Sequence, residues 1–229
     1  MPSPLRATLE PRKRPVQARS AVTVDAVLEA TLQVLLEAGK ERLTTTRVAY
    51  RAGVSVGTLY QYFPNKSALL QGVLTRHLDR VTSAVEEVCR QERGKTLSEM
   101  ATALVNTFLE AKMKDGKASV ALYAVGSDVD GAKIAQRVGV RSNKAIVGML
   151  GSARDGLTLD AQLVASMVQA AMMGASRMLL ESDAPEKRFE AVRRELVFFV
   201  CTYLEASSKR IGSDVGSQPR RALEQPRSF

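Results

Sequence analysis

Apolar residues recur at intervals of three and four along most of this 229-residue chain. That spacing places them on one face of an α-helix, whereas a half-buried strand alternates with a period of two. No alternating stretch is long enough to indicate a sheet, so the pattern predicts an all-α protein. Besides two short helices within residues 44–63, helices are expected at about 23–38, 66–90, 97–113, 118–125, 130–150, 159–180 and 186–207.

The segment 44–63 predicts a helix-turn-helix. After an apolar face that includes Val48, Gly53 can take the left-handed conformation that ends a helix. Ser55 is a good cap for the next helix, in which Leu59 and Phe63 lie four residues apart and face the core. The residues left outward are small or carry hydroxyl or amide groups, which suit contact with base edges and phosphates. They are Val56, Gly57, Thr58, Tyr60, Gln61 and Tyr62.

Composition and charge divide the chain into four segments. Prolines at the density found in residues 1–20 block a helix, so a flexible basic arm is expected there. The DNA-binding domain is expected at 21–81, a helical second domain at 82–207 and a disordered tail at 208–229. The net charge of +9 lies in the tails and the first domain, because acidic and basic residues balance within 82–207. A polyanionic partner for the N-terminal part is one interpretation, and basic tails that only aid solubility are the other.

Three local patterns mark two further helix starts and a turn. Thr96 and Glu99 have the spacing of a capping box, and Thr158 is expected to cap the helix 159–180. Lys112, with Lys114 and Lys117 nearby, indicates a solvated turn.

Catalytic and metal sites are not expected. The chain has a single histidine, His77, for which a structural role is expected, and its two cysteines lack a C-x-x-C spacing. Neither G-x-S-x-G nor a glycine-rich phosphate loop is present, so an enzyme and a bound cofactor are not expected. The N-terminus carries charges where a signal peptide needs an apolar run, which predicts a cytoplasmic protein. The uncharged stretch 161–176 is shorter than a bilayer span of about 20 residues and predicts a packing helix rather than a membrane segment.

The helices expected at 159–180 and 186–207 carry more apolar surface than one neighbour would cover. Two such helices predict a four-helix interface with a second copy of the chain. The alternative is that the surplus is covered within one subunit.

Residues from about 21 to 81 resemble the TetR family of bacterial transcriptional regulators, whereas the rest matches in length and helix layout only. The resemblance is carried by eighteen positions in fixed register. They are Thr44-Thr45, Val48-Ala49, Ala52-Gly53-Val54-Ser55, Gly57-Thr58-Leu59-Tyr60, Tyr62-Phe63, Asn65-Lys66 and Leu69-Leu70.

The resemblance implies roles for particular positions. Thr45, Thr46 and Arg47 match residues that contact phosphates or a base edge, and Tyr60 and Lys66 match phosphate contacts. The face laid in the major groove is matched by Val56, Gly57, Thr58, Gln61 and Tyr62. Two positions depart from the family pattern. Lys40 replaces a usual aromatic, so Leu43 is expected to supply that packing. Arg47 replaces a common acidic residue, so it is a candidate for reading guanine or for holding a phosphate.

By this resemblance the chain is expected to be a repressor that binds a palindromic double-stranded DNA operator as a homodimer. A small-molecule effector in the second domain would release it. Candidate pocket residues are Phe108, Tyr123, Met167 and Met172, which are equally good core residues. The alternative is a DNA-binding protein without a small-molecule ligand, acting in chromosome organisation or through a protein partner.

Overall fold

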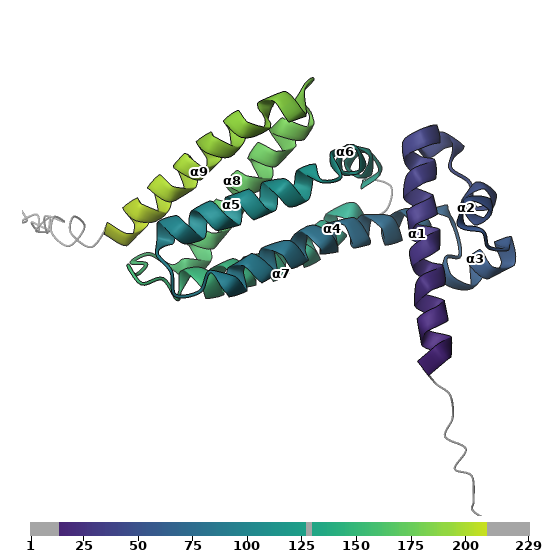
Figure 1. The fold of residues 1–229 in the computed structure, drawn as a ribbon, viewed down its shortest axis with the longest axis horizontal. Helices are drawn as coiled ribbons and strands as arrows, with labels where there is room; N and C mark the ends of the chain where they lie inside the picture. Colours follow the sequence, from purple (N-terminus) through teal and green to yellow (C-terminus); the bar gives the residue numbers. More distant parts are fainter. Residues whose placement is uncertain (1–13, 127–129, 210–229) are drawn as a thin grey trace, which may run out of the picture. The chain divides into compact units, whose positions relative to one another are not determined.

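The computed structural model describes residues 14–126 and 130–209, and all regular secondary structure in these ranges is α-helical (Figure 1). The all-α prediction is confirmed for this part of the chain. The expected arm and tail lie largely outside the described residues. The helices are α1 (Arg14–Arg42), α2 (Thr45–Ala52), α3 (Val56–Tyr62), α4 (Lys66–Gln91), α5 (Leu97–Met113), α6 (Gly116–Val125), α7 (Gly131–Leu150), α8 (Ala161–Leu180) and α9 (Pro185–Lys209).

The first helix begins earlier than the sequence suggested. Residues 14–20 were expected within a non-helical arm, but α1 starts at Arg14. Pro15 is compatible with this start because a proline in the first turn of a helix removes no intrahelical hydrogen bond. At the other end Gly39 interrupts the helical conformation with φ 76°. Leu43 follows and is buried in the core, so its expected packing role is confirmed.

The described chain forms two compact units, and the first contains more than the helix-turn-helix. It comprises residues up to 82 together with 111–139. Its apolar core joins side chains of α1 to α4 with Leu122 and Val125 of α6 and with Ile134 and Val138 of α7. The expected boundary at residue 81 placed α6 and all of α7 in the second domain. Contacts across the sequence group α6 and the first half of α7 with the helix-turn-helix instead.

Close packing within this first unit depends on Gly72 of α4. A Cβ atom at Gly72 would lie 2.7 Å from Cδ2 of Leu28 and 3.0 Å from Cε1 of Phe63. Real Cβ atoms essentially never approach another heavy atom this closely. Glycine therefore allows α4 to lie against α1 and against the end of α3.

The second unit comprises residues 83–110 and 140 onward. The predicted capping box is confirmed at the start of α5, where the backbone amide of Thr96 donates to Oε2 of Glu99 at 2.9 Å. The backbone amide of Glu99 donates in return to the Thr96 hydroxyl at 3.3 Å. The predicted cap of α8 is wrong. Asp160 caps that helix by accepting from the Gln162 amide at 3.0 Å, while the Thr158 hydroxyl donates to the backbone carbonyl of Ser207.

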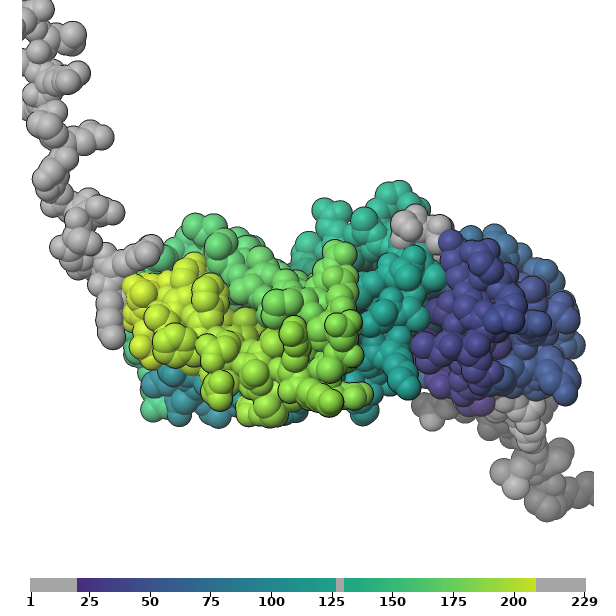
Figure 2. Space-filling view, turned by 90° about the horizontal axis from the view of Figure 1, so that it is seen from above, coloured from purple at the N-terminus to yellow at the C-terminus, as the bar shows by residue number. Residues whose placement is uncertain are grey.

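Helices α8 and α9 pack against each other, and Figure 2 shows their surface in green to yellow. Among the described helices α8 alone has the length and hydropathy of a membrane span, with 39% of its apolar window buried. A core helix of a globular protein passes the same test, so this property does not distinguish the two.

Candidate nucleic-acid interface

The expected caps of the helix-turn-helix are present. The Thr44 side chain accepts from the Arg47 amide at 3.3 Å and opens α2. Gly53 ends α2 in the left-handed conformation with φ 67°, as predicted. The Ser55 hydroxyl then accepts from the Thr58 amide at 3.0 Å, so α3 begins at a side-chain cap. These local bonds fix the turn between the two helices.

The recognition helix α3 buries one face and exposes the other. Leu59 and Phe63 lie in the core, as predicted. Val56, Gly57, Tyr60 and Gln61 are exposed. At Gly57 the only heavy atom within 4 Å of an added Cβ would be the Ser55 hydroxyl at 3.7 Å. No side chain protrudes from the helix surface at Gly57, so the wall of a DNA groove can approach the backbone closely there.

Two residues expected on this outward face are partly turned inward. Tyr62 is half-buried and packs against the core, because it lies three residues after Leu59 and so borders the apolar stripe. Thr58 is also half-buried, and its hydroxyl lies 2.8 Å from that of Ser55.

A side-chain contact connects the first turn of α2 to α3. The Thr45 hydroxyl lies 3.2 Å from the Tyr60 hydroxyl. In the family resemblance Tyr60 matches a phosphate contact, and Thr45 matches a contact with a phosphate or a base edge. Their hydrogen bond brings two hydroxyl groups to one point of the exposed surface, where the hydroxyl that accepts in this bond can donate its own hydrogen to a phosphate oxygen.

Basic side chains surround the carboxyl end of α1. Nε of Arg42 donates to the Ala38 carbonyl at 3.2 Å, and Nη1 of Arg47 donates to the Arg42 carbonyl at 3.2 Å. Nζ of Lys66 donates to the carbonyl of Lys40. Cations are stabilised at this helix end because its carbonyl groups carry partial negative charge. Positive charge is thereby gathered next to the start of α2.

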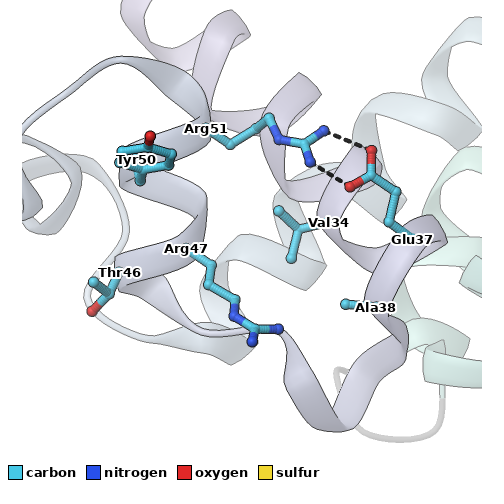
Figure 3. Close-up of a pocket in the computed structure, with 7 residues that line it drawn as sticks. All are labelled: Val34, Glu37, Ala38, Thr46, Arg47, Tyr50 and Arg51. Carbon is cyan, nitrogen blue, oxygen red and sulfur yellow. Dashed lines mark hydrogen bonds and ion pairs between the residues drawn. The ribbon is translucent and has the colours of Figure 1, made fainter.

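Arg47 also borders a groove of about 450 Å³ between α1 and α2 (Figure 3). Figure 3 shows its guanidinium reaching toward α1. Arg51 forms a two-pronged ion pair with Glu37 across the groove, with one N–O distance of 2.7 Å, and this hydrogen bonding lowers the pKa of the Glu37 carboxyl. The groove is lined by Val34, Glu37, Ala38, Thr46, Arg47, Tyr50 and Arg51. The structure therefore gives Arg47 a contact with α1 that the sequence did not indicate.

The four expected ligand residues lie in different settings. Phe108 and Met172 are buried in the second unit, whereas Met167 is 53% exposed on α8. Met167 on an outward helix face does not fit the expected enclosed pocket. Tyr123 belongs to the first unit, and its hydroxyl accepts from Nζ of Lys112 at 2.7 Å.

Sequence reasoning missed a buried polar cluster in the first unit. Lys112 was expected in a solvated turn, but its side chain is buried. His77 is buried as well, and its Nε2 lies 2.9 Å from the Ser119 hydroxyl. The pKa of His77 is lowered to about 4, mainly by burial and further by the charges of Lys112 and Arg80, while the charge of Asp115 opposes the shift. Lysine is rarely buried, so no local pattern marks it.

Two family models match this chain. The one described as "Bacterial regulatory proteins, tetR family" matches residues 27–73, and the one described as "Tetracyclin repressor-like, C-terminal domain" matches residues 96–204. The chain belongs to the TetR family. TetR-family proteins are DNA-binding transcriptional regulators and are not enzymes.

Similar proteins include a nucleoid occlusion factor and a transcriptional repressor. The nucleoid occlusion factor SlmA of Haemophilus ducreyi is 36% identical over 90 residues, which cover 39% of this chain and 44% of SlmA. The HTH-type transcriptional repressor KstR of Rhodococcus jostii is 46% identical over 57 residues, which cover 25% of this chain and 27% of KstR. The TetR-family chain thus spans less than half the length of these relatives.

Solved structures share the fold. A TetR-family transcription regulator from Marinobacter aquaeolei VT8 has a TM-score of 0.59 at 18% identity, and the match covers 80% of this chain and 97% of that one. The SmeT–triclosan complex has a TM-score of 0.61 at 20% identity, with 86% and 99% covered. At these identities the likeness shows the TetR fold alone.

Proposed function

We propose that this TetR-family protein is a cytoplasmic repressor that binds a palindromic operator as a homodimer and releases it when a small molecule binds. The observation that carries the DNA-binding half is the exposed face of α3 next to the basic end of α1. Gln61 offers an amide for reading base edges, and the paired hydroxyls of Thr45 and Tyr60 suit a phosphate. Both sets of groups lie in one compact unit.

The homodimer is supported by an apolar surface on α8 and α9. Its large side chains are exposed, with Phe198 at 67% and Phe199 at 57%. Large apolar side chains exposed on two helices that pack together indicate an interaction surface rather than a solvated one. The exposed apolar residues on the two helices are Leu163, Met167, Met173, Met178, Phe198 and Phe199. A second copy would cover them in a four-helix interface.

Replacing Phe199 by glutamate tests this interface. We expect the wild-type protein to elute as a dimer in size-exclusion chromatography with light scattering, and Phe199→Glu to shift toward monomer. Lys144→Gln changes the charge by the same amount at an exposed position of α7, and it should remain dimeric. A wild-type monomer would refute the proposed interface.

The operator is tested by selecting binding sites from random duplex DNA. A dimer predicts two inverted half-sites whose centres are one helical turn, or a multiple of it, apart. A reporter gene behind the selected site then separates repression from activation. Selected sites without inverted symmetry would contradict a two-fold dimer on DNA.

The ligand-responsive half rests on a fold similarity. SmeT was solved with triclosan bound, and it shares the fold of this chain. By the family resemblance, a small molecule would bind this protein and shift it toward a form that does not fit the operator.

A second candidate function is binding along the chromosome without a small-molecule ligand. The similarity to SlmA, named as a nucleoid occlusion factor, favours it. Chromatin immunoprecipitation separates the two candidates. A repressor should occupy a few promoters, whereas a nucleoid-binding protein should occupy many dispersed sites irrespective of promoters.

A further inference from the structure

A buried lysine lies where α5 meets α6. The Lys112 side chain is 2% exposed, and its ammonium group donates to the Tyr123 hydroxyl at 2.7 Å. The Tyr123 side chain reaches the surface, since the residue is 36% exposed. A buried ammonium gains more from a carboxylate than from a neutral phenol, because charge-assisted hydrogen bonds are stronger. The phenol oxygen therefore occupies a position that suits an anionic oxygen.

A buried histidine of the same cluster has one ring nitrogen unused. His77 is 4% exposed, and its Nδ1 makes no hydrogen bond within the described part of the chain. The Ser119 hydroxyl donates to the backbone carbonyl of Lys112 at 3.3 Å. Nε2 of His77 must then carry the hydrogen of its 2.9 Å contact with Ser119, which leaves a lone pair on Nδ1. Nδ1 therefore needs a donor, or a proton of its own and an acceptor.

The charged groups that act on His77 are two cations and one anion. Lys112 on α5 and Arg80 on α4 are cationic, and Asp115 in the turn before α6 pairs with Arg80 at 2.8 Å. Tyr123 on α6 contributes a neutral hydroxyl. One more negative charge would be favourable in this setting.

We propose that Lys112 and His77 form the seat for the carboxyl group of a small organic acid, with the Tyr123 hydroxyl covering the seat in the free protein. This inference rests on the ligand-responsive half of the proposed function. The acid displaces the Tyr123 hydroxyl from Lys112. One carboxyl oxygen accepts from the ammonium group, and the other shares a proton with Nδ1 of His77. At neutral pH that proton comes from the solvent, so one proton enters with each carboxylate.

The position of α6 explains how an acid at this seat would affect DNA binding. Leu122, next to Tyr123, packs in the core that also contains Val48 of α2 and Leu59 of α3. Displacing Tyr123 moves α6, and α6 shares its core with the recognition helix. The signal would thus travel within one compact unit.

The test uses the full chain and a panel of organic acids, among them octanoate and benzoate, each paired with its primary amide. Thermal unfolding should show that at least one acid raises the midpoint and that its amide does not. Calorimetric titration of that acid in two buffers of different ionisation heat should report uptake of about one proton. The affinity should rise up to tenfold per unit as the pH falls from 7.5 to 5.5. If no acid in the panel stabilises the protein more than its amide does, the proposal is overturned.

Variants assign the seat to its residues. Lys112→Met should weaken acid binding at least tenfold, whereas Lys117→Met, at an exposed lysine of α6, should leave it unchanged. Tyr123→Phe should bind the acid more tightly, because no hydroxyl has to leave the ammonium group. A purely structural Lys112–Tyr123 pair would give no tightening, and this readout stands even if Lys112→Met folds poorly.

Failure of the seat and failure of the proposed function give different results. Wild-type protein that binds its operator but prefers no acid refutes the seat and leaves the repressor proposal intact. Acid binding that leaves the operator affinity unchanged supports the seat and refutes release by this ligand.

Discussion

The ammonium group of Lys66, in the first turn of α4, donates to the backbone carbonyl of Lys40 at the end of α1. The two residues are 26 positions apart. A residue expected to hold DNA phosphate therefore also fixes the chain where it leaves α1. A lysine has three donors, so one can hold the carbonyl while another contacts a phosphate.

Replacing Lys66 by alanine should change both DNA binding and stability. Losing one phosphate contact should lower the slope of log affinity against log salt by about 0.9 for all DNA sequences. Losing a charged hydrogen bond should lower the free energy of unfolding by about 1–3 kcal/mol. Fluorescence anisotropy at several salt concentrations and urea unfolding measure the two effects. Lys114→Ala, at an exposed lysine outside the helix-turn-helix, is the control. If the salt slope stays unchanged while the stability falls, Lys66 does not contact a phosphate and only holds the end of α1.

Gln61 and Arg47 should differ in their contribution to sequence recognition. Gln61 is exposed on α3, so Gln61→Ala should cost about 1–3 kcal/mol on the selected operator and less on random DNA. Arg47 donates to the carbonyl of Arg42 and reaches toward α1, so Arg47→Ala should weaken both DNAs by similar amounts. Competition titrations with operator and random duplexes measure the difference. A larger loss on the operator for Arg47→Ala would mean that its side chain leaves α1 to read a base.

Gly72→Ala should destabilise the first unit. The added methyl would lie 2.7 Å from Leu28 and 3.0 Å from Phe63, so these buried side chains or α4 must shift, at a cost of about 1–3 kcal/mol. Gly148→Ala is the matched control on α7. There the nearest atom is the mobile guanidinium of Arg93 at 3.2 Å, so the gain in helix propensity should offset much of the strain. Thermal unfolding compares the two variants, and equal midpoints would contradict the close approach at Gly72.

Acidification should destabilise the protein through His77. Its pKa is about 4 in the folded state and about 6.5 in the unfolded state, so the unfolded chain binds more protons between these values. The free energy of unfolding should therefore fall by about 3 kcal/mol as the pH drops from 7 to 4. His77 is the only histidine, so the change in the free energy of unfolding between pH 7 and 5.5 should come mainly from its protonation. Urea unfolding across this range measures it, and His77→Gln should remove most of the slope.

Local features of the helix-turn-helix were predictable from sequence because their causes lie within a few residues. The left-handed Gly53, the Ser55 cap and the buried pair Leu59 and Phe63 are of this kind. The two residues of the capping box, Thr96 and Glu99, are three positions apart, and the box was predicted for the same reason. Thr158 was a plausible cap by composition, but a tertiary bond to the carbonyl of Ser207 uses its hydroxyl.

The sequence by itself determined that the chain is helical, where most helices lie and which face of α3 is outward, because these depend on residues three and four apart. Only the tertiary structure decided that α6 joins the core of the helix-turn-helix, that Lys66 holds the end of α1 and that Lys112 is buried. The bond between His77 and Ser119 joins residues 42 positions apart. No local pattern encodes such a contact, because it exists only once the helices have packed together.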